Sequence, residues 1–158
     1  MIKLKTEVIK YSKKLNTTNL SALRSGNISV RVKEKGVEGF YITPSGMKYS
    51  SLKTKDIVFV SLKGIFDKKK NKPSSEWRFH QDIYVNKKEA KAIVHAHSTC
   101  ATAVSSHQKN IPAFHYMVAV AGGEDLKCTK YATFGTKQLS KNIIKALKNR
   151  SACLIANH

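Results

Sequence analysis

The stretch KAIVHAHSTCATAVSSH (residues 91–107) decides the fold class, because it joins a strand pattern directly to a helix pattern. The segment 90–97 is short, apolar and rich in β-branched residues, which predicts a buried strand. Ser98 then stands at the head of residues 98–107, where it predicts the cap of a helix. Helices that alternate with strands along one chain are typical of a layered α/β domain.

The same alternation continues on both sides of this stretch. Apolar residues at helical spacing predict a first amphipathic helix, and serines followed by a glutamate predict the start of another at residues 73–76. A further helix, the fourth along the chain, is predicted over residues 136–150, with one apolar side. The first helix is marked by Leu4, Val8, Tyr11 and Leu15, and the fourth by Leu139, Ile143, Ala146 and Leu147.

Short segments of strand character lie between these helices and after the last one. The clearest is residues 27–32, in which apolar and polar residues alternate strictly, as in a half-buried strand. Further strands are predicted at residues 39–43, 56–62, 64–67 and 152–158. No linker, repeat or low-complexity tract interrupts the pattern, so we predict one domain over residues 1–158.

The composition narrows the class of protein. The chain has 158 residues, of which 41% are hydrophobic, enough for one domain with a sizeable core. The N-terminus is too rich in lysine for a signal peptide, and no apolar run is long enough to span a bilayer. The three cysteines are odd in number and far apart, which favours reduced thiols. We therefore predict a cytoplasmic protein without a membrane partner.

The formal net charge of +19 invites a nucleic-acid interpretation. Against it, almost all basic residues are lysines spread along the chain, with one dense run at residues 68–72. Arginines, which favour base and bidentate phosphate recognition, are few, and no aromatic residues interleave with the lysines. We expect no specific nucleic-acid partner, while the positive field suits a small anionic substrate.

His95 and His97 are candidate metal ligands. On a strand, residues two apart share a face, so both imidazoles should project together, as zinc or a similar divalent metal requires. This spacing alone fits two unrelated hydrogen-bonded histidines equally well. Among the other histidines, we predict that His80 is packed in the core, His115 is a satisfied core residue, His107 is exposed and His158 reaches the edge of a site.

Three turns built from small residues could bind an anion. The tripeptide SSE (74–76) heads a helix, where free N–H groups and the helix dipole attract phosphate, although plain capping explains it equally well. The turns 25–27 and 44–46 contain glycines that let N–H groups approach a ligand. Together with the histidine pair, they suggest a phosphorylated substrate beside a metal.

An ordered series of motifs resembles the class II aldolase/adducin family. The motifs are SGNISVR, ITPSG, PSSEWRFH, VHAH, IPAFHYM, AGG, YATFGT and ALKNR, and they extend from residue 25 to the last residue. The resemblance implies a three-layer α/β/α fold around a mainly antiparallel sheet, and a cytosolic zinc enzyme that forms a homotetramer with active sites at subunit interfaces. It is greatest to members that cleave L-fuculose 1-phosphate to dihydroxyacetone phosphate and L-lactaldehyde.

The resemblance also assigns roles to residues. It implies that one Zn²⁺ is held by Glu76, His95, His97 and His158, and that Glu76 also moves the proton. It implies that Tyr116 is a catalytic tyrosine supplied across the interface and that Phe134 lines the neighbouring site. The positions that match phosphate-binding residues are Gly26, Asn27, Ser45, Gly46, Ser74 and Ser75.

Other functions on the same scaffold stay open. Family members include 4-epimerases, dehydratases and decarboxylases of sugar phosphates, and adducin-type heads that lack the zinc ligands. Members continue past the third histidine into a helical C-terminal segment, whereas this sequence stops at His158. From this difference we expect a truncated aldolase, or an inactive truncated paralogue, with weakened metal binding, reduced stability and low or absent activity.

Overall fold

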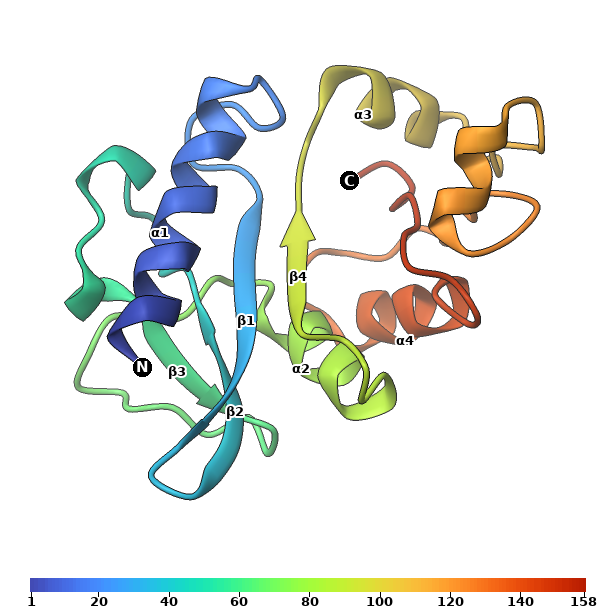
Figure 1. The fold of residues 1–158 in the computed structure, drawn as a ribbon. Coiled ribbons are helices and arrows are strands. Elements are labelled where there is room, and N and C mark those ends of the chain that lie inside the picture. Colours follow the sequence, from blue (N-terminus) through green and yellow to red (C-terminus); the bar gives the residue numbers. More distant parts are fainter. The chain divides into compact units, whose positions relative to one another are not determined.

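A four-stranded sheet with the strand order β3-β2-β1-β4 forms the centre of the first half of the chain (Figure 1). All three pairings are antiparallel. The structure is a computed structural model that describes residues 1–158. The strands are β1 (Asn27–Glu34), β2 (Val37–Ile42), β3 (Val58–Ser61) and β4 (Ala92–His95).

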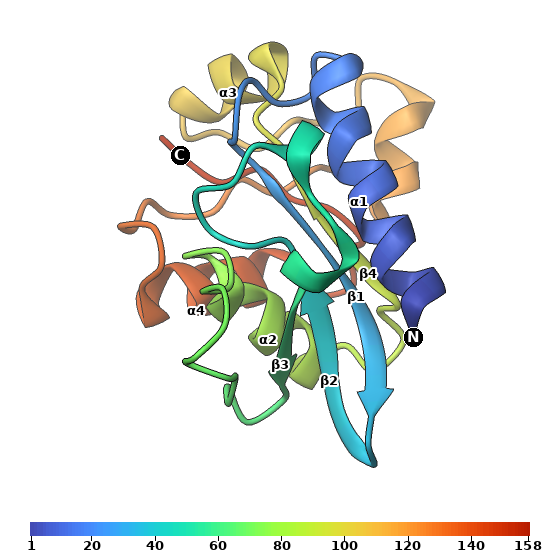
Figure 2. The same cartoon turned by 90° about the vertical axis from the view of Figure 1, so that its left-hand side faces the viewer.

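Two helices cover opposite faces of this sheet, as Figure 2 shows: α1 (Ile2–Thr17) and α2 (Trp77–Asn86). The alternation of β2 explains the layers, because neighbouring residues of a strand point to opposite faces. Tyr41 packs in the cluster with Val8 of α1, whereas Phe40 packs in the cluster with Tyr84 of α2. The predicted three-layer α/β/α fold is confirmed.

The inward face of α1 differs from the prediction at one position. Tyr11 is 47% exposed, while Ser12 is fully buried. Ser12 can be buried because its hydroxyl donates to the Val8 carbonyl at 2.6 Å, which satisfies the polar group within the helix. Val8 and Leu15 face the core as predicted.

The predicted strand at residues 64–67 is wrong. Ser61 N–H donates to the carbonyl of Ile65, and Ile65 N–H donates to the hydroxyl of Ser61, so the chain closes a tight turn. Gly64 lies within this turn at φ +78°, a conformation that suits glycine. β3 therefore has no partner immediately after it.

The strand predicted at residues 90–97 is shorter and less buried than expected. β4 ends at His95, and Val94 is 58% exposed. The reason is its place at the edge of the sheet, where it pairs only with β1. His97 therefore lies beyond the strand.

The chain divides into two compact units, Met1–Ser98 and Thr99–His158. The second unit contains α3 (Thr99–Ser106), a 3₁₀ helix (Tyr116–Ala121) and α4 (Lys137–Ala146). Leu139, Ile143 and Ala146 of α4 are buried, which confirms its predicted apolar side. The prediction of one domain stays a prediction.

The predicted strand at residues 152–158 is wrong, because the segment forms only one bridge, between Leu154 and Cys128. Leu154 N–H donates to Lys127, and Thr129 N–H donates to Leu154. The next link, from Ala156 N–H, goes to the side-chain hydroxyl of Thr129, which ends the ladder after one step.

All three cysteines are free thiols, as predicted. None of the helices combines the length and the apolar character that crossing a membrane demands.

Candidate metal centre

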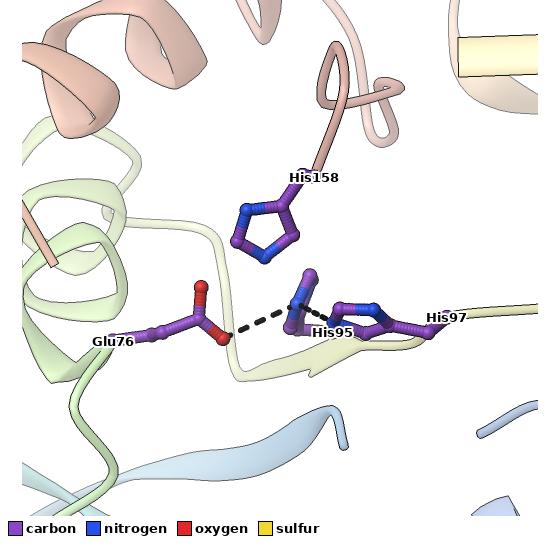
Figure 3. A group of neighbouring side chains, drawn as sticks. All are labelled: Glu76, His95, His97 and His158. Atoms are coloured by element: carbon purple, nitrogen blue, oxygen red, sulfur yellow. Dashed lines mark hydrogen bonds and ion pairs between the residues drawn. The ribbon is translucent and has the colours of Figure 1, made fainter. Parts of the chain in front are cut away.

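Glu76, His95 and His97 lie together at one end of the sheet (Figure 3). Glu76 Oε2 is 3.2 Å from His95 Nε2, and the two Nε2 atoms of the histidines are 2.8 Å apart. Glu76 and His95 are buried. The predicted projection of both imidazoles to the same place is confirmed, although His97 is not on the strand. Figure 3 also draws His158, the last residue of the second unit.

The sheet register and two side chains bring these groups together. Asn27, the first residue of β1, pairs with His95 in β4, and its side-chain amide donates to Glu76 Oε2 at 2.9 Å. His97 N–H donates to the hydroxyl of Ser21 at 2.9 Å, which fixes the chain just beyond β4. The candidate ligands therefore depend on the fold of the first unit.

The donor set fits a divalent metal. Zinc is held by imidazole nitrogens and carboxylate oxygens at about 2.0–2.1 Å, so two ligand atoms on a tetrahedral ion are about 3.4 Å apart. The separations of 3.2 Å and 2.8 Å are close to that value. A movement of the histidine rings by about half an ångström would reach tetrahedral spacing. The three residues can therefore hold a metal ion.

His80 is not a candidate ligand. It is fully buried, as predicted, and burial lowers its pKa to about 3, with a smaller contribution from the charge of His95. Its Nδ1 atom is 2.7 Å from the hydroxyl of Ser29, and its Nε2 atom bonds Asn27 Oδ1. Both nitrogens have partners inside the protein, so His80 is a neutral core residue.

Two of the predicted anion-binding turns are joined by main-chain hydrogen bonds. Ser45 N–H donates to Lys72, and Ser74 N–H donates to Thr43, at 2.9 and 3.0 Å. The link places the turn 44–46 beside the segment that leads into α2. Ser45 and Ser75 line a pocket of about 400 Å³. Its other lining residues are Phe66, Lys68, Lys72, Pro73 and Trp77.

The third turn, residues 25–27, joins the same region. The Arg24 guanidinium donates to the carbonyl of Gly46 at 2.7 Å, and the Tyr49 hydroxyl donates to the carbonyl of Gly26. Burial raises the pKa of Tyr49 to about 12, so its hydroxyl remains a donor. The three turns that the sequence singled out are neighbours in the first unit.

The candidate phosphate-binding residues differ in their exposure to solvent. Ser45, Gly46 and Ser75 are exposed, whereas Ser74 is buried and its hydroxyl accepts from Glu76 N–H at 3.3 Å. The side chain of Asn27 is occupied by Glu76 and His80. A phosphate contact from Asn27 would therefore come from its main chain.

The candidate residues of the second unit lie largely in solvent. Tyr116 is 78% exposed and Phe134 is 62% exposed. The prediction that His115 is a core residue is wrong: it is exposed and its Nδ1 accepts from Met117 N–H, which caps the 3₁₀ helix. His107 is exposed, as predicted. The roles of Tyr116 and Phe134 stay predictions.

Ser21 and Ser29 are site-supporting residues that the sequence did not reveal. Alternation in β1 predicts Ser29 and Asn27 on a solvated face, yet Ser29 is fully buried and Asn27 is 2% exposed. Their face carries hydrogen-bonded polar groups beneath α2, and alternation cannot distinguish such a face from a solvated one. A buried histidine in the facing helix, His80, is the signal that could have suggested polar partners.

Comparison with known proteins identifies the family of the chain. The sequence profile described as the class II aldolase and adducin N-terminal domain matches residues 6–158. The chain is 42% identical over 157 residues to a 5-methylthioribulose-1-phosphate/5-deoxyribulose-1-phosphate aldolase of Rhodospirillum rubrum, covering 99% of this chain and 69% of that protein. It is also 42% identical to the L-fuculose phosphate aldolase of Escherichia coli, over 99% of this chain and 70% of that protein.

A solved structure gives the same result. The structure of an L-fuculose 1-phosphate aldolase superposes with a TM-score of 0.91 at 43% identity, covering 99% of this chain and 72% of that one. Profile, sequence and fold therefore agree along nearly the whole length of the chain. The chain belongs to the class II aldolase and adducin family.

Proposed function

We propose that the chain is a metal-dependent aldolase that cleaves a ketose 1-phosphate into dihydroxyacetone phosphate and an aldehyde. Its enzyme class, a lyase, follows from its relationship to the aldolases of the family. The observation that carries the proposal is the approach of Glu76, His95 and His97 to one another beside three turns suited to an anion. A metal-dependent carbon–carbon lyase acting on a phosphorylated sugar needs both features in one place.

The proposed cofactor is one Zn²⁺ per subunit, held by Glu76, His95, His97 and His158. Three neutral imidazoles leave most of the charge of the ion in place. Zinc bound there would supply Lewis-acid stabilisation of the negative charge that develops on a substrate oxygen. His158 is proposed as the histidine that the second unit contributes.

Glu76 is proposed to move the proton on carbon. When the C3–C4 bond of the ketose phosphate breaks, its electron pair stays on the carbon of the dihydroxyacetone phosphate fragment, which must then gain a proton. A buried carboxylate held at a fixed position by Asn27 can take a proton from that carbon in the direction of synthesis, and the carboxylic acid so formed can return it to the carbon in cleavage.

Tyr116 is proposed to act at the aldehyde oxygen of a neighbouring subunit's substrate. In the direction of synthesis the aldehyde oxygen gains a proton as the C3–C4 bond forms, and a tyrosine hydroxyl can donate it; in cleavage the tyrosinate takes that proton back from the C4 hydroxyl. The 78% exposure of Tyr116 and the 62% exposure of Phe134 leave both rings available to a second copy. This arrangement supports the proposed homotetramer with sites at the interfaces.

The phosphate is proposed to bind at the three turns, through Gly26, Asn27, Ser45, Gly46, Ser74 and Ser75. The two serines that precede α2 and the lysines of the adjacent pocket provide donors and positive charge. The net charge of +19 would raise the local concentration of an anionic substrate.

L-Fuculose 1-phosphate is the proposed substrate, giving L-lactaldehyde as the second product. The relatives with 42% identity are named for two kinds of substrate, so 5-deoxyribulose and 5-methylthioribulose 1-phosphates are the second candidates. We propose that the reaction takes place in the cytoplasm, in keeping with three free thiols.

The test is a direct assay of the zinc-loaded protein with each of the three ketose 1-phosphates. The release of dihydroxyacetone phosphate is measured through its enzymatic reduction, and the aldehyde is identified by mass spectrometry. We expect one substrate to be cleaved, with activity lost in Glu76→Gln by roughly 100-fold or more. A protein with stoichiometric zinc that releases no dihydroxyacetone phosphate, or that only epimerises pentose phosphates, would refute the proposal.

A further inference from the structure

A line of buried polar side chains runs from the candidate metal centre into the core. It begins at Glu76, passes through the amide of Asn27 and the imidazole of His80, and ends at the hydroxyls of Ser29 and Tyr84. The members come from β1 and from α2 with the residue before it. All five residues are at most 7% exposed. The line is therefore shielded from bulk water.

The direction of the hydrogen bonds at the near end is fixed by chemistry. Asn27 Nδ2 is 2.9 Å from Glu76 Oε2, and a carboxylate can only accept. The amide of Asn27 is thereby oriented, so its Oδ1 atom faces His80 as an acceptor. His80 Nε2 must then carry a proton and donate it to Asn27.

The donor and acceptor roles at the far end of the line follow from the same reasoning. Since burial keeps His80 neutral and Nε2 carries the proton, Nδ1 is an acceptor. Nδ1 is 2.7 Å from the hydroxyl of Ser29, which therefore donates to it. Ser29 in turn accepts from the hydroxyl of Tyr84 at 2.8 Å. Every proton in the line has one position.

Arg31 stabilises the far end. Its guanidinium lies over the ring of Tyr84, 4.8 Å from the centroid, and also donates to the main-chain carbonyl of that residue at 2.6 Å. The hydroxyl at the end of the line is thus attached to a ring held by the sheet and by α2. One end of the line is therefore fixed in the core, and the other end is Glu76 at the candidate metal centre.

We propose that His80 is a positioning residue that fixes the amide of Asn27, and through it the carboxylate of Glu76. Without the donor at Nε2, the amide could turn by 180° and present its oxygen to the carboxylate, which would push Glu76 away. This inference rests on the proposed function in that it assigns Glu76 to metal binding and proton transfer. Its test is therefore built on measurements that need no substrate.

The first measurement is the tautomer of His80 in the metal-free protein labelled with ¹⁵N. Long-range ¹H–¹⁵N correlation spectra distinguish a protonated Nε2 from a protonated Nδ1, and the His80→Gln variant identifies the signals by their loss. We expect the proton on Nε2. A proton on Nδ1 would reverse the line and overturn the inference.

The second measurement compares two variants of similar size. The amide nitrogen of His80→Gln can replace the Nε2 donor, whereas His80→Met fills the space without a donor. Loss of an outer hydrogen-bond partner typically weakens metal binding by roughly 10- to 100-fold. We expect His80→Met to show that loss of zinc affinity in competition with a chelator, and His80→Gln to retain most of the affinity.

A purely structural role predicts a different result, in which both variants lose stability and zinc affinity together, or neither loses affinity. Either outcome would overturn the inference. If His80→Met does not fold, Ser29→Ala removes the donor to Nδ1 and allows both tautomers, and we expect a smaller loss of zinc affinity. Weakened zinc binding in a protein without aldolase activity would support the positioning role while refuting the proposed function.

Discussion

Gly26 lies against the main chain of β4 so closely that a Cβ atom at this position would be 2.5 Å from the carbonyl oxygen of His95. The same Cβ would be 2.7 Å from the hydroxyl of Ser21, which holds His97. The glycine also has a φ of +77°, in the left-handed region. The approach of the turn to the candidate metal centre therefore requires the absence of a side chain.

Gly26→Ala is expected to destabilise the protein by more than about 3 kcal/mol, because left-handed strain adds to the contact with His95. Gly36→Ala is the matched control: Gly36 has a φ of +83° with nothing within 4 Å of a Cβ. It should lose only about 1–2 kcal/mol from strain. Urea unfolding measures both, and equal losses would contradict the proposed contact.

The buried His80 should make the folded protein less stable as the pH falls. Its pKa is about 3 in the folded protein and about 6.5 in an unfolded chain, so below pH 6.5 only the unfolded state takes up the proton. Stability is therefore lost as the pH falls, by about 1.4 kcal/mol per pH unit from this group. Between pH 7 and pH 5, metal-free wild-type protein should lose about 2 kcal/mol more than His80→Gln. Parallel pH curves from urea unfolding would rule this out.

The cysteines should differ in reactivity toward alkylating reagents. Burial raises the pKa of Cys153 to about 12 and also raises the pKa of Cys128, and only the thiolate reacts. Cys100 is exposed. Iodoacetamide at neutral pH should therefore label Cys100 first, as read by peptide mass spectrometry, and Cys100→Ser should nearly abolish early labelling. Rapid labelling of Cys153 would disagree with its raised pKa.

Removal of an exposed serine beside α2 should affect substrate binding more than folding. Ser75→Ala should raise the KM for the ketose 1-phosphate by roughly 10-fold, because a hydrogen bond to a charged group is lost. The serine is exposed, so the melting temperature should stay unchanged. Ser50→Ala, at another exposed serine, is the control. A KM equal to that of wild type would remove Ser75 from the phosphate site.

The assignment of Tyr116 to a neighbouring site can be tested by mixing subunits. Tyr116→Phe should lower kcat by roughly 100-fold, without loss of stability, since the ring is 78% exposed. Tyr131→Phe, at a ring that is 56% exposed, serves as the control. Co-assembly of Tyr116→Phe with Glu76→Gln should restore activity, because some sites then combine an intact Glu76 with an intact Tyr116. If mixed subunits remain inactive, both residues act within one chain.

The sequence predicted those parts of the fold in which local pattern and tertiary environment agree. The strand character of residues 27–32 and the apolar side of α4 both correspond to observed elements. It failed where a side chain replaced a main-chain partner. The hydroxyl of Thr129 ends the ladder at Leu154, and the hydroxyl of Ser61 closes the turn at Gly64.

For the site, the spacing of His95 and His97 predicted that both side chains face the same way. This prediction was possible because the relative direction of two side chains so close in sequence depends mainly on the local backbone. The approach of Glu76 to them depends on the pairing of β1 with β4 and on Asn27, which no local pattern contains. The polar face of β1 was assigned to solvent because a buried serine and a solvated serine look the same in sequence. Only the facing helix decides between them.

The line from Glu76 to Tyr84 makes the interior and the candidate metal centre subject to one constraint. During evolution, a surface loop can change without consequence. A replacement at Ser29 or Tyr84, by contrast, would alter the hydrogen bonds of His80 and Asn27 and so change which residues are favoured there. Descendants should therefore keep this set together or exchange it together, and the fitness effect of one change should depend on the others. Coupled replacement would be the evolutionary record of a carboxylate at the candidate metal centre that is supported from within the core.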